Sequence, residues 1–189
     1  NVNSRIQNIV GSWARSGEPE AAARWTMANL PQGSGRRTAI RFATSNWATT
    51  DPIAAANYSL ELPENERNDS LWGMADSWVE KDPMSALPFI SNHERPEEIT
   101  SLTNSVFWQW AQIKDGSELT GVVMQLPPGK VRNDAMNGLF RGWARQDQEK
   151  PVEHLNQMPN GWLKDSAIRG YVNWVTRSSP QLALEWSTQ

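Results

Sequence analysis

Apolar residues recur along the chain at intervals of three and four positions, in segments that each end at a Trp. In the segment that ends at Trp47, the apolar positions are Ala39, Ile40 and Ala43. This spacing places the apolar side chains on one face of an α-helix. The pattern therefore predicts an all-α protein in which each such segment is the first helix of a repeated unit.

This segment occurs six times along the chain. The Trp residues at its end lie 34, 31, 32, 33 and 31 residues apart. Recurrence at a nearly fixed period of this size is typical of stacked helical repeats. We expect these Trp residues to form the structural core of the repeats, buried between stacked helix pairs. They are Trp13, Trp47, Trp78, Trp110, Trp143 and Trp174, and we call them the Trp column.

A second helix is predicted a few residues after each column Trp. In the second repeat it starts at Asp51-Pro52, where the Asp side chain can accept hydrogen bonds from free amides and Pro takes the first helical position. Asp115 and Asp147 mark weaker starts that lack the following Pro. The second helix ends before a proline, because the residue that precedes proline is pushed out of the helical region. The predicted ends are Leu30-Pro31, Leu62-Pro63, Arg95-Pro96, Leu126-Pro127 and Met158-Pro159.

Together these signals predict about twelve helices in six helix-turn-helix repeats of 31 to 34 residues. Such pairs cannot bury their apolar faces alone, so they stack into an α-solenoid. We predict a single repeat domain over residues 1–189. Its repeats are about 2–35, 36–66, 67–98, 99–131, 132–162 and 163–189. Neither end resembles a polar capping repeat, so we expect the natural array to be longer.

The Trp column, the small residues of the second helix and its closing Pro resemble the tetratricopeptide-like αα-hairpin repeat superfamily. The Leu-Gly that follows the Trp in tetratricopeptide repeats is absent from this chain. The combination of Trp-Ala, Asp-Pro and Leu-Pro is most similar to the tandem repeats of large uncharacterised bacterial proteins. The resemblance covers the whole chain and implies a right-handed αα-superhelix with a scaffold role. It implies no catalytic residue.

Composition excludes several classes of function. A net charge of −3 and a pI near 5.5 leave no overall positive field that would favour nucleic acid or an anionic membrane. The absence of cysteine excludes disulfides, thiol catalysis and thiolate metal sites. No apolar run approaches the ~18 residues of a membrane span, and no signal peptide begins the chain. Cytoplasm and periplasm are both compatible with this composition, so the compartment stays open.

Candidate catalytic residues are few. The two histidines, His93 and His154, each stand beside a Glu, which is weak evidence for acid-base chemistry. The chain has no nucleophile turn of the hydrolase type and no clustered metal ligands. Gly33-Ser34-Gly35 resembles a phosphate-binding loop but lacks the preceding strand and the following Lys-Ser/Thr. We therefore expect no enzymatic activity, no metal and no cofactor.

The candidate binding residues are those that depart from the repeat pattern. Trp72 and Trp108 lie outside the Trp column, on one flank of the first helix, and Arg41 and Arg141 occupy that flank in other repeats. A position that varies while its neighbours stay constant suits a binding surface, and Trp and Arg are typical interface anchors. The alternative is that these Trp side chains fill gaps between adjacent helices. Trp162, before the sixth repeat, is a further exposed candidate or a lid.

We predict a non-enzymatic scaffold that presents this flank to a protein or peptide segment. An alternative is a helical accessory domain of a larger cell-wall or polysaccharide-processing protein, in which exposed Trp side chains stack on glycan. RNA binding by a repeat code is a third possibility, and the acidic balance of the chain argues against it. The oligomeric state stays open.

Overall fold

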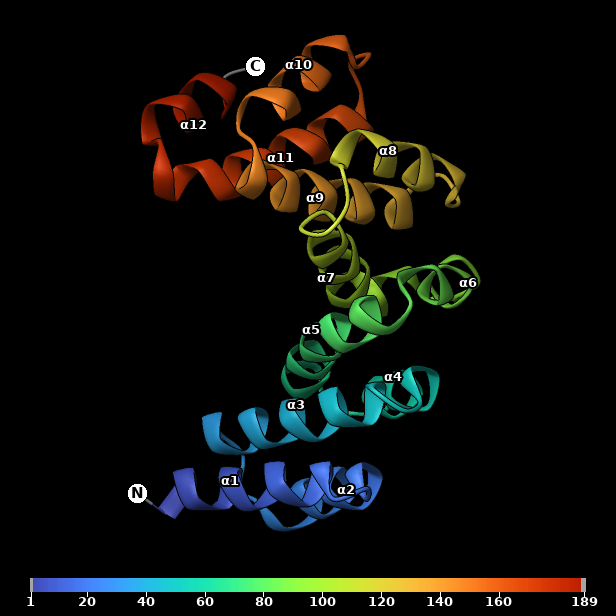
Figure 1. Cartoon of the computed structure of the whole chain (residues 1–189), viewed down its shortest axis with the longest axis vertical. Helices are drawn as coiled ribbons and strands as arrows, with labels where there is room; N and C mark the ends of the chain where they lie inside the picture. The colour runs from blue at the N-terminus through green and yellow to red at the C-terminus, as the bar shows by residue number, and fades with distance from the viewer. Residues whose placement is uncertain (1, 188–189) are drawn as a thin grey trace. The chain divides into compact units, whose positions relative to one another are not determined.

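The structure is a computed structural model that describes residues 2–187 of the chain (Figure 1). Within this range it contains twelve α-helices, two short 3-10 helices and no strand. The predicted all-α class and the predicted number of helices are confirmed. Residues 1, 188 and 189, which we placed in the repeat domain, lie outside the described residues.

The helices form two compact units whose boundary lies between residues 84 and 85, where we predicted one continuous domain. Each unit is described by itself. The helices of the first unit are α1 (Val2–Arg15), α2 (Pro19–Asn29), α3 (Ser34–Ala48), α4 (Pro52–Leu60) and α5 (Glu64–Lys81). The first helices of successive repeats pack on one another, α1 on α3 and α3 on α5 (Figure 1). Each second helix packs on the first helix of its own repeat and on the first helix of the next repeat, as in an α-solenoid. Thus α2 lies against α1 and α3, and α4 lies against α3 and α5.

The second unit repeats this arrangement. Its helices are α6 (Ala86–Ser91), the 3-10 helix η2 (Pro96–Ile99), α7 (Thr100–Trp110), α8 (Gly116–Gln125), α9 (Lys130–Gln146), α10 (Glu149–Gln157), α11 (Trp162–Ser178) and α12 (Pro180–Ser187). The first helices pack in the order α7, α9, α11 (Figure 1). The second helix α10 packs on both α9 and α11, and α12 packs on α11.

The third repeat departs from the regular pattern. The 3-10 helix η1 (Pro83–Ser85) and the six-residue α6 occupy the place of its second helix. Pro83, Pro88 and Pro96 each lack a backbone N–H, and this shortens the run of helical hydrogen bonds. His93 therefore lies in the turn after α6, whereas His154 lies within α10, so the two histidines do not occupy equivalent helical positions.

The predicted helix starts work as caps, including the weaker ones. The Asp51 carboxylate accepts a hydrogen bond from the Ala54 amide at 2.9 Å, and the Asp115 carboxylate accepts one from the Ser117 amide at 2.8 Å. Hydrogen bonds from the hydroxyl and the amide of Ser117 lower the pKa of the Asp115 carboxyl below its ordinary value. Asp147 accepts amide hydrogen bonds at the start of α10 in the same manner. The Asp alone is therefore sufficient to start the second helix without Pro.

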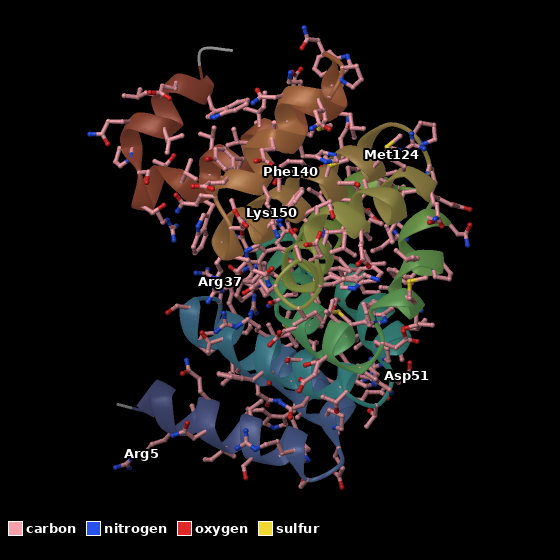
Figure 2. The ribbon with its side chains drawn as sticks, turned by 45° about the horizontal axis from the view of Figure 1, so that its top comes forward. Arg5, Arg37, Asp51, Met124, Phe140 and Lys150 are labelled. Carbon is pink, nitrogen blue, oxygen red and sulfur yellow. The ribbon has the colours of Figure 1, made fainter. Side chains whose placement is uncertain are left out.

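The four inner members of the Trp column are buried, with 8 % of Trp47, 4 % of Trp110, 3 % of Trp143 and none of Trp78 exposed. A ring from the second helix packs against the column Trp. The ring centroids of Trp47 and Tyr58 are 5.6 Å apart, and those of Trp143 and His154 are 5.7 Å apart. Phe140, one helical turn before Trp143, lies inside the second unit (Figure 2).

The two outer members of the Trp column are only half-buried, which corrects our expectation of a fully buried column. Trp13 belongs to the first helix of the chain, packs against Trp25 and donates through Nε1 to a Glu18 carboxylate oxygen at 2.9 Å. Trp174 differs from Trp47 and Trp143 in its contact with the second helix. Tyr171 takes that place, with its ring 6.0 Å from the ring of Trp186.

His154 makes the stability of the second unit sensitive to pH. Burial beside the rings of Phe140 and Trp143 lowers the pKa of His154 below its ordinary value of 6.5. Above pH 6.5 the imidazole is neutral in both the folded and the unfolded chain. As the pH falls below that value, the unfolded chain takes up the proton first, so stability is lost as the pH falls through the pKa of the folded state.

We therefore expect the melting temperature to decrease between about pH 7 and about pH 5.5, measured by circular dichroism in matched buffers. The control is His154→Tyr, because Tyr58 occupies the corresponding position in the second repeat and does not titrate in this range. An equal decrease in the variant would show that other groups cause the effect.

Candidate binding site

Within each unit, the structure brings two of the predicted binding residues together. Arg41 and Trp72 lie together in the first unit, and Trp108 and Arg141 lie together in the second. Trp162 begins α11, and 77 % of its side chain is exposed. It belongs to neither cluster.

In the second unit, Trp and Arg side chains alternate across three neighbouring helices. The guanidinium of Arg141 on α9 lies 5.1 Å from the ring centroid of Trp108 on α7. The guanidinium of Arg145 lies 6.0 Å from the ring of Trp108 and 5.7 Å from the ring of Trp174 on α11. Distances of this size are typical of cation–π contacts. We call Trp108, Arg141, Arg145 and Trp174 the Trp–Arg ladder.

Glycines in α9 bring the ladder residues together. A Cβ atom on Gly138 would lie 2.1 Å from the carbonyl oxygen of Asn104, and one on Gly142 would lie 2.4 Å from the carbonyl oxygen of Trp108. Only glycine allows the backbones of α7 and α9 to approach this closely. Gly138 and Gly142 lie three residues before and one residue after Arg141, so the close approach places the Arg141 guanidinium on the Trp108 ring.

The contact between α9 and α11 is made in the same way. A Cβ atom on Gly170 would lie 2.1 Å from the carbonyl oxygen of Asn137 and 3.1 Å from the backbone nitrogen of Arg141. Gly170 lies four residues before its column Trp, whereas Gly138 lies five residues before Trp143. The different register at the closest approach turns Trp174 out of the core and toward Arg145. This explains why Trp174 joins the ladder instead of the core.

A chain of amide side chains holds the three helices in register. The side-chain nitrogen of Asn104 donates to the side-chain oxygen of Asn137 at 2.6 Å. The side-chain nitrogen of Asn137 donates in turn to the backbone carbonyl of Ser166 on α11 at 3.2 Å. Gln112 orients the outer arginine, because its side-chain oxygen accepts a hydrogen bond from Arg145 Nη1 at 2.6 Å. The ladder is therefore built on a rigid support.

The positive charge of the ladder is not neutralised within the protein. Across the described part of the chain, Arg141, Arg145 and Arg177 have no carboxylate within ion-pair distance. Burial, and then the nearby charge of Arg177, lower the pKa of Arg141 from its ordinary value. The Nε atom of Arg141 is buried and has no hydrogen-bond partner. The guanidiniums of Arg141 and Arg145 thus share one surface, with the charge of Arg177 on α11 nearby, and no ion pair within the described residues neutralises them.

The cluster of the first unit is smaller and more apolar. The guanidinium of Arg41 lies 5.7 Å from the ring of Phe42 and 5.8 Å from the ring of Trp72, and both aromatic side chains are 43 % exposed. A Cβ atom on Gly73 would lie 2.2 Å from the Cγ atom of Arg41, so glycine at this position gives Arg41 the room to lie across α5. This cluster carries one cation, compared with three around the ladder.

The loop that resembles a phosphate-binding motif does not offer free positive charge. Gly33 precedes α3 with a φ of 147°, a backbone conformation that favours glycine. The pocket at this loop, of about 140 Å³, is lined in part by Arg36. Arg36 forms an ion pair with Glu66 at 2.5 Å, and Arg37 forms one with Asp69 at 3.1 Å. Both cations instead connect α3 to α5, so the loop is a junction between repeats.

The prediction of binding residues from the sequence found part of the ladder and missed the rest. It included Trp108 and Arg141 among the residues of one flank, but it did not include Arg145 or Arg177 and it assigned Trp174 to the core. Arg145 lies one helical turn after Arg141, on the same face of α9, and this spacing could have identified it. One sequence signal distinguishes Trp174 from Trp143, because Trp174 lies four residues after the glycine at the helix contact and Trp143 lies five residues after it.

The described residues contain no group of three or more His, Asp or Glu side chains that could hold a metal ion. In residues 2–187, no helix combines the length and the apolar character needed to cross a membrane. The chain matches no protein-family model, no curated protein and no solved structure.

Proposed function

We propose that the chain is a non-enzymatic binding scaffold of the tetratricopeptide-like αα-hairpin type, which takes a segment of another protein on the surface of its first helices. The observation that carries this proposal is the Trp–Arg ladder. It combines two of the three residue types that are enriched at the energetic centres of protein interfaces, on a support that holds them in place. A preorganised surface loses little side-chain entropy when a partner binds.

The burial of the ladder residues supports a binding role over gap filling. Trp108, Arg141 and Trp174 are half-buried, whereas Arg145 is exposed. A residue that only filled a gap between helices would be apolar, since burial of an unpaired cation is unfavourable. Arginines without a carboxylate partner are therefore better explained by the binding of a partner than by a role in stabilising the fold.

To test the proposal, we would compare the proteins captured from native lysate by the chain and by its Trp72→Ala/Trp108→Ala variant, with quantitative mass spectrometry. We expect the variant to lose a partner that the unchanged chain retains, because truncation of interface anchors costs ~2 kcal/mol or more. Trp25→Ala is the matched control, since Trp25 is 40 % exposed and lies outside both clusters. Identical capture profiles for all three proteins, each folded by circular dichroism, would contradict the proposal.

A second candidate is a helical accessory domain that binds glycan. The observation in its favour is Trp162, whose exposed ring at the start of α11 could stack on a sugar. Isothermal titration with cell-wall oligosaccharides separates the two candidates. Binding that is lost in Trp162→Ala and retained in Trp108→Ala would favour the glycan function.

A further inference from the structure

We propose that the Trp–Arg ladder, together with Arg177, recognises the carboxylates of an acidic protein segment rich in Asp or Glu. This inference rests on the proposed scaffold function and names the chemistry of its partner.

The charge of the surface favours an anionic ligand. The guanidiniums of Arg141 and Arg145 both lie against the ring of Trp108, and Arg177 is near enough to Arg141 for their charges to interact. Such like charges repel one another, and they are most stable when an anion lies between them. Among the described residues, neither an ion pair nor a hydrogen bond to these guanidiniums supplies this anion.

The aromatic rings orient the arginines instead of stacking on a ligand. Two guanidiniums lie within 6.0 Å of the Trp108 ring, and Arg145 also lies 5.7 Å from the ring of Trp174. The cations thus occupy the space around the rings that a nucleobase or a sugar would need. A guanidinium held by a ring keeps its N–H donors available, and these match the geometry of a carboxylate.

The surroundings of the ladder favour a protein segment over a nucleic acid. Gln109, Gln112 and Gln146 lie beside Arg145 and form a hydrogen-bonded group with it. Amide side chains of this kind can donate to and accept from a peptide backbone. A nucleic acid would need a basic track along the chain, whereas the net charge here is −3 and two arginines of the first unit, Arg36 and Arg37, are paired with carboxylates.

The test uses the full chain and fluorescence anisotropy with labelled probes at low salt. The probes are a short Glu-Ser repeat peptide, the Gln-Ser peptide of the same length, a phosphoserine peptide and a single-stranded RNA. We expect the Glu-Ser peptide to bind at least about tenfold more tightly than the Gln-Ser peptide, and to weaken as NaCl is added, because the contacts are charge-assisted.

The matched variants assign the binding to the ladder. Arg145→Gln and Arg177→Gln change exposed residues, so we expect them to fold and to reduce affinity for the Glu-Ser peptide by about tenfold when combined. Arg95→Gln, the control for each single variant, removes one positive charge elsewhere in the second unit, at a side chain that is 70 % exposed, and we expect it to have a much smaller effect.

Three results would overturn the inference: equal affinity for the Glu-Ser and Gln-Ser peptides, unchanged affinity in the double variant, or tighter binding of the RNA or the phosphoserine peptide than of the Glu-Ser peptide. Its failure can be separated from a failure of the scaffold function. If the Glu-Ser peptide does not bind but the capture experiment still loses a partner with Trp72→Ala/Trp108→Ala, only the acidic chemistry is wrong.

Discussion

Gly138→Ala is expected to destabilise the second unit by about 3 kcal/mol or more. The new Cβ atom would lie 2.1 Å from the carbonyl oxygen of Asn104 and 2.9 Å from its carbonyl carbon. Both are backbone atoms of α7, so no side-chain rotation relieves the overlap and the two helices must move apart. This movement would also break the hydrogen bond from Asn104 to Asn137.

Urea denaturation followed by far-UV circular dichroism measures this effect. The matched control is Gly121→Ala in the same unit, because a Cβ atom at Gly121 has no heavy atom within 4 Å. Since Ala is the better helix former, we expect this control to be unchanged or more stable by up to about 1 kcal/mol. Equal stability of the two variants would show that α7 and α9 do not approach each other this closely.

Trp78→Ala is expected to reduce the stability of the first unit by about 3–5 kcal/mol. Trp78 is completely buried in α5, so its removal leaves a cavity that the surrounding helices can fill only in part. Thermal denaturation would show the loss as a large decrease in melting temperature.

Trp72→Ala removes the same side chain from the same helix and serves as the control. Trp72 is 43 % exposed, and it contacts the guanidinium of Arg41 at 5.8 Å. We expect its replacement to cost about 1 kcal/mol, as is typical of an exposed cation–π contact and a partly buried ring. If both variants lost the same stability, the distinction between the Trp column and the binding candidates would be wrong.

These predictions connect the stability of the second unit to its proposed function. Gly138 and Gly142 allow α9 to contact the backbone of α7, and the same contact places Arg141 against Trp108. The energy that holds an unpaired arginine in this position comes from the close packing of the helices around it. A binding surface supported in this way keeps its shape before the partner arrives.

The repeat architecture could be predicted from the sequence because its signals are local. The spacing of apolar residues places the buried face of each first helix, and it correctly identified the inner members of the Trp column. The proline rule placed the ends of the second helices, since Leu30, Leu126 and Met158 have the extended backbone expected before a proline. The third repeat is the exception, because three prolines within a short stretch shorten its second helix.

The sequence by itself determined the all-α class, the period, the helix ends and the inner core, because each of these depends on residues a few positions apart in the chain. Only the tertiary structure decided which side chains form the candidate site. The apolar residues before Trp174 and before Trp143 have the same spacing, yet Trp174 lies in the ladder and Trp143 in the core. The difference arises from the register of α11 on α9, which depends on how Gly170 meets the backbone of a residue 33 positions earlier, Asn137. Contacts between residues so far apart follow from helix packing, and the spacing of apolar residues within one helix does not record them.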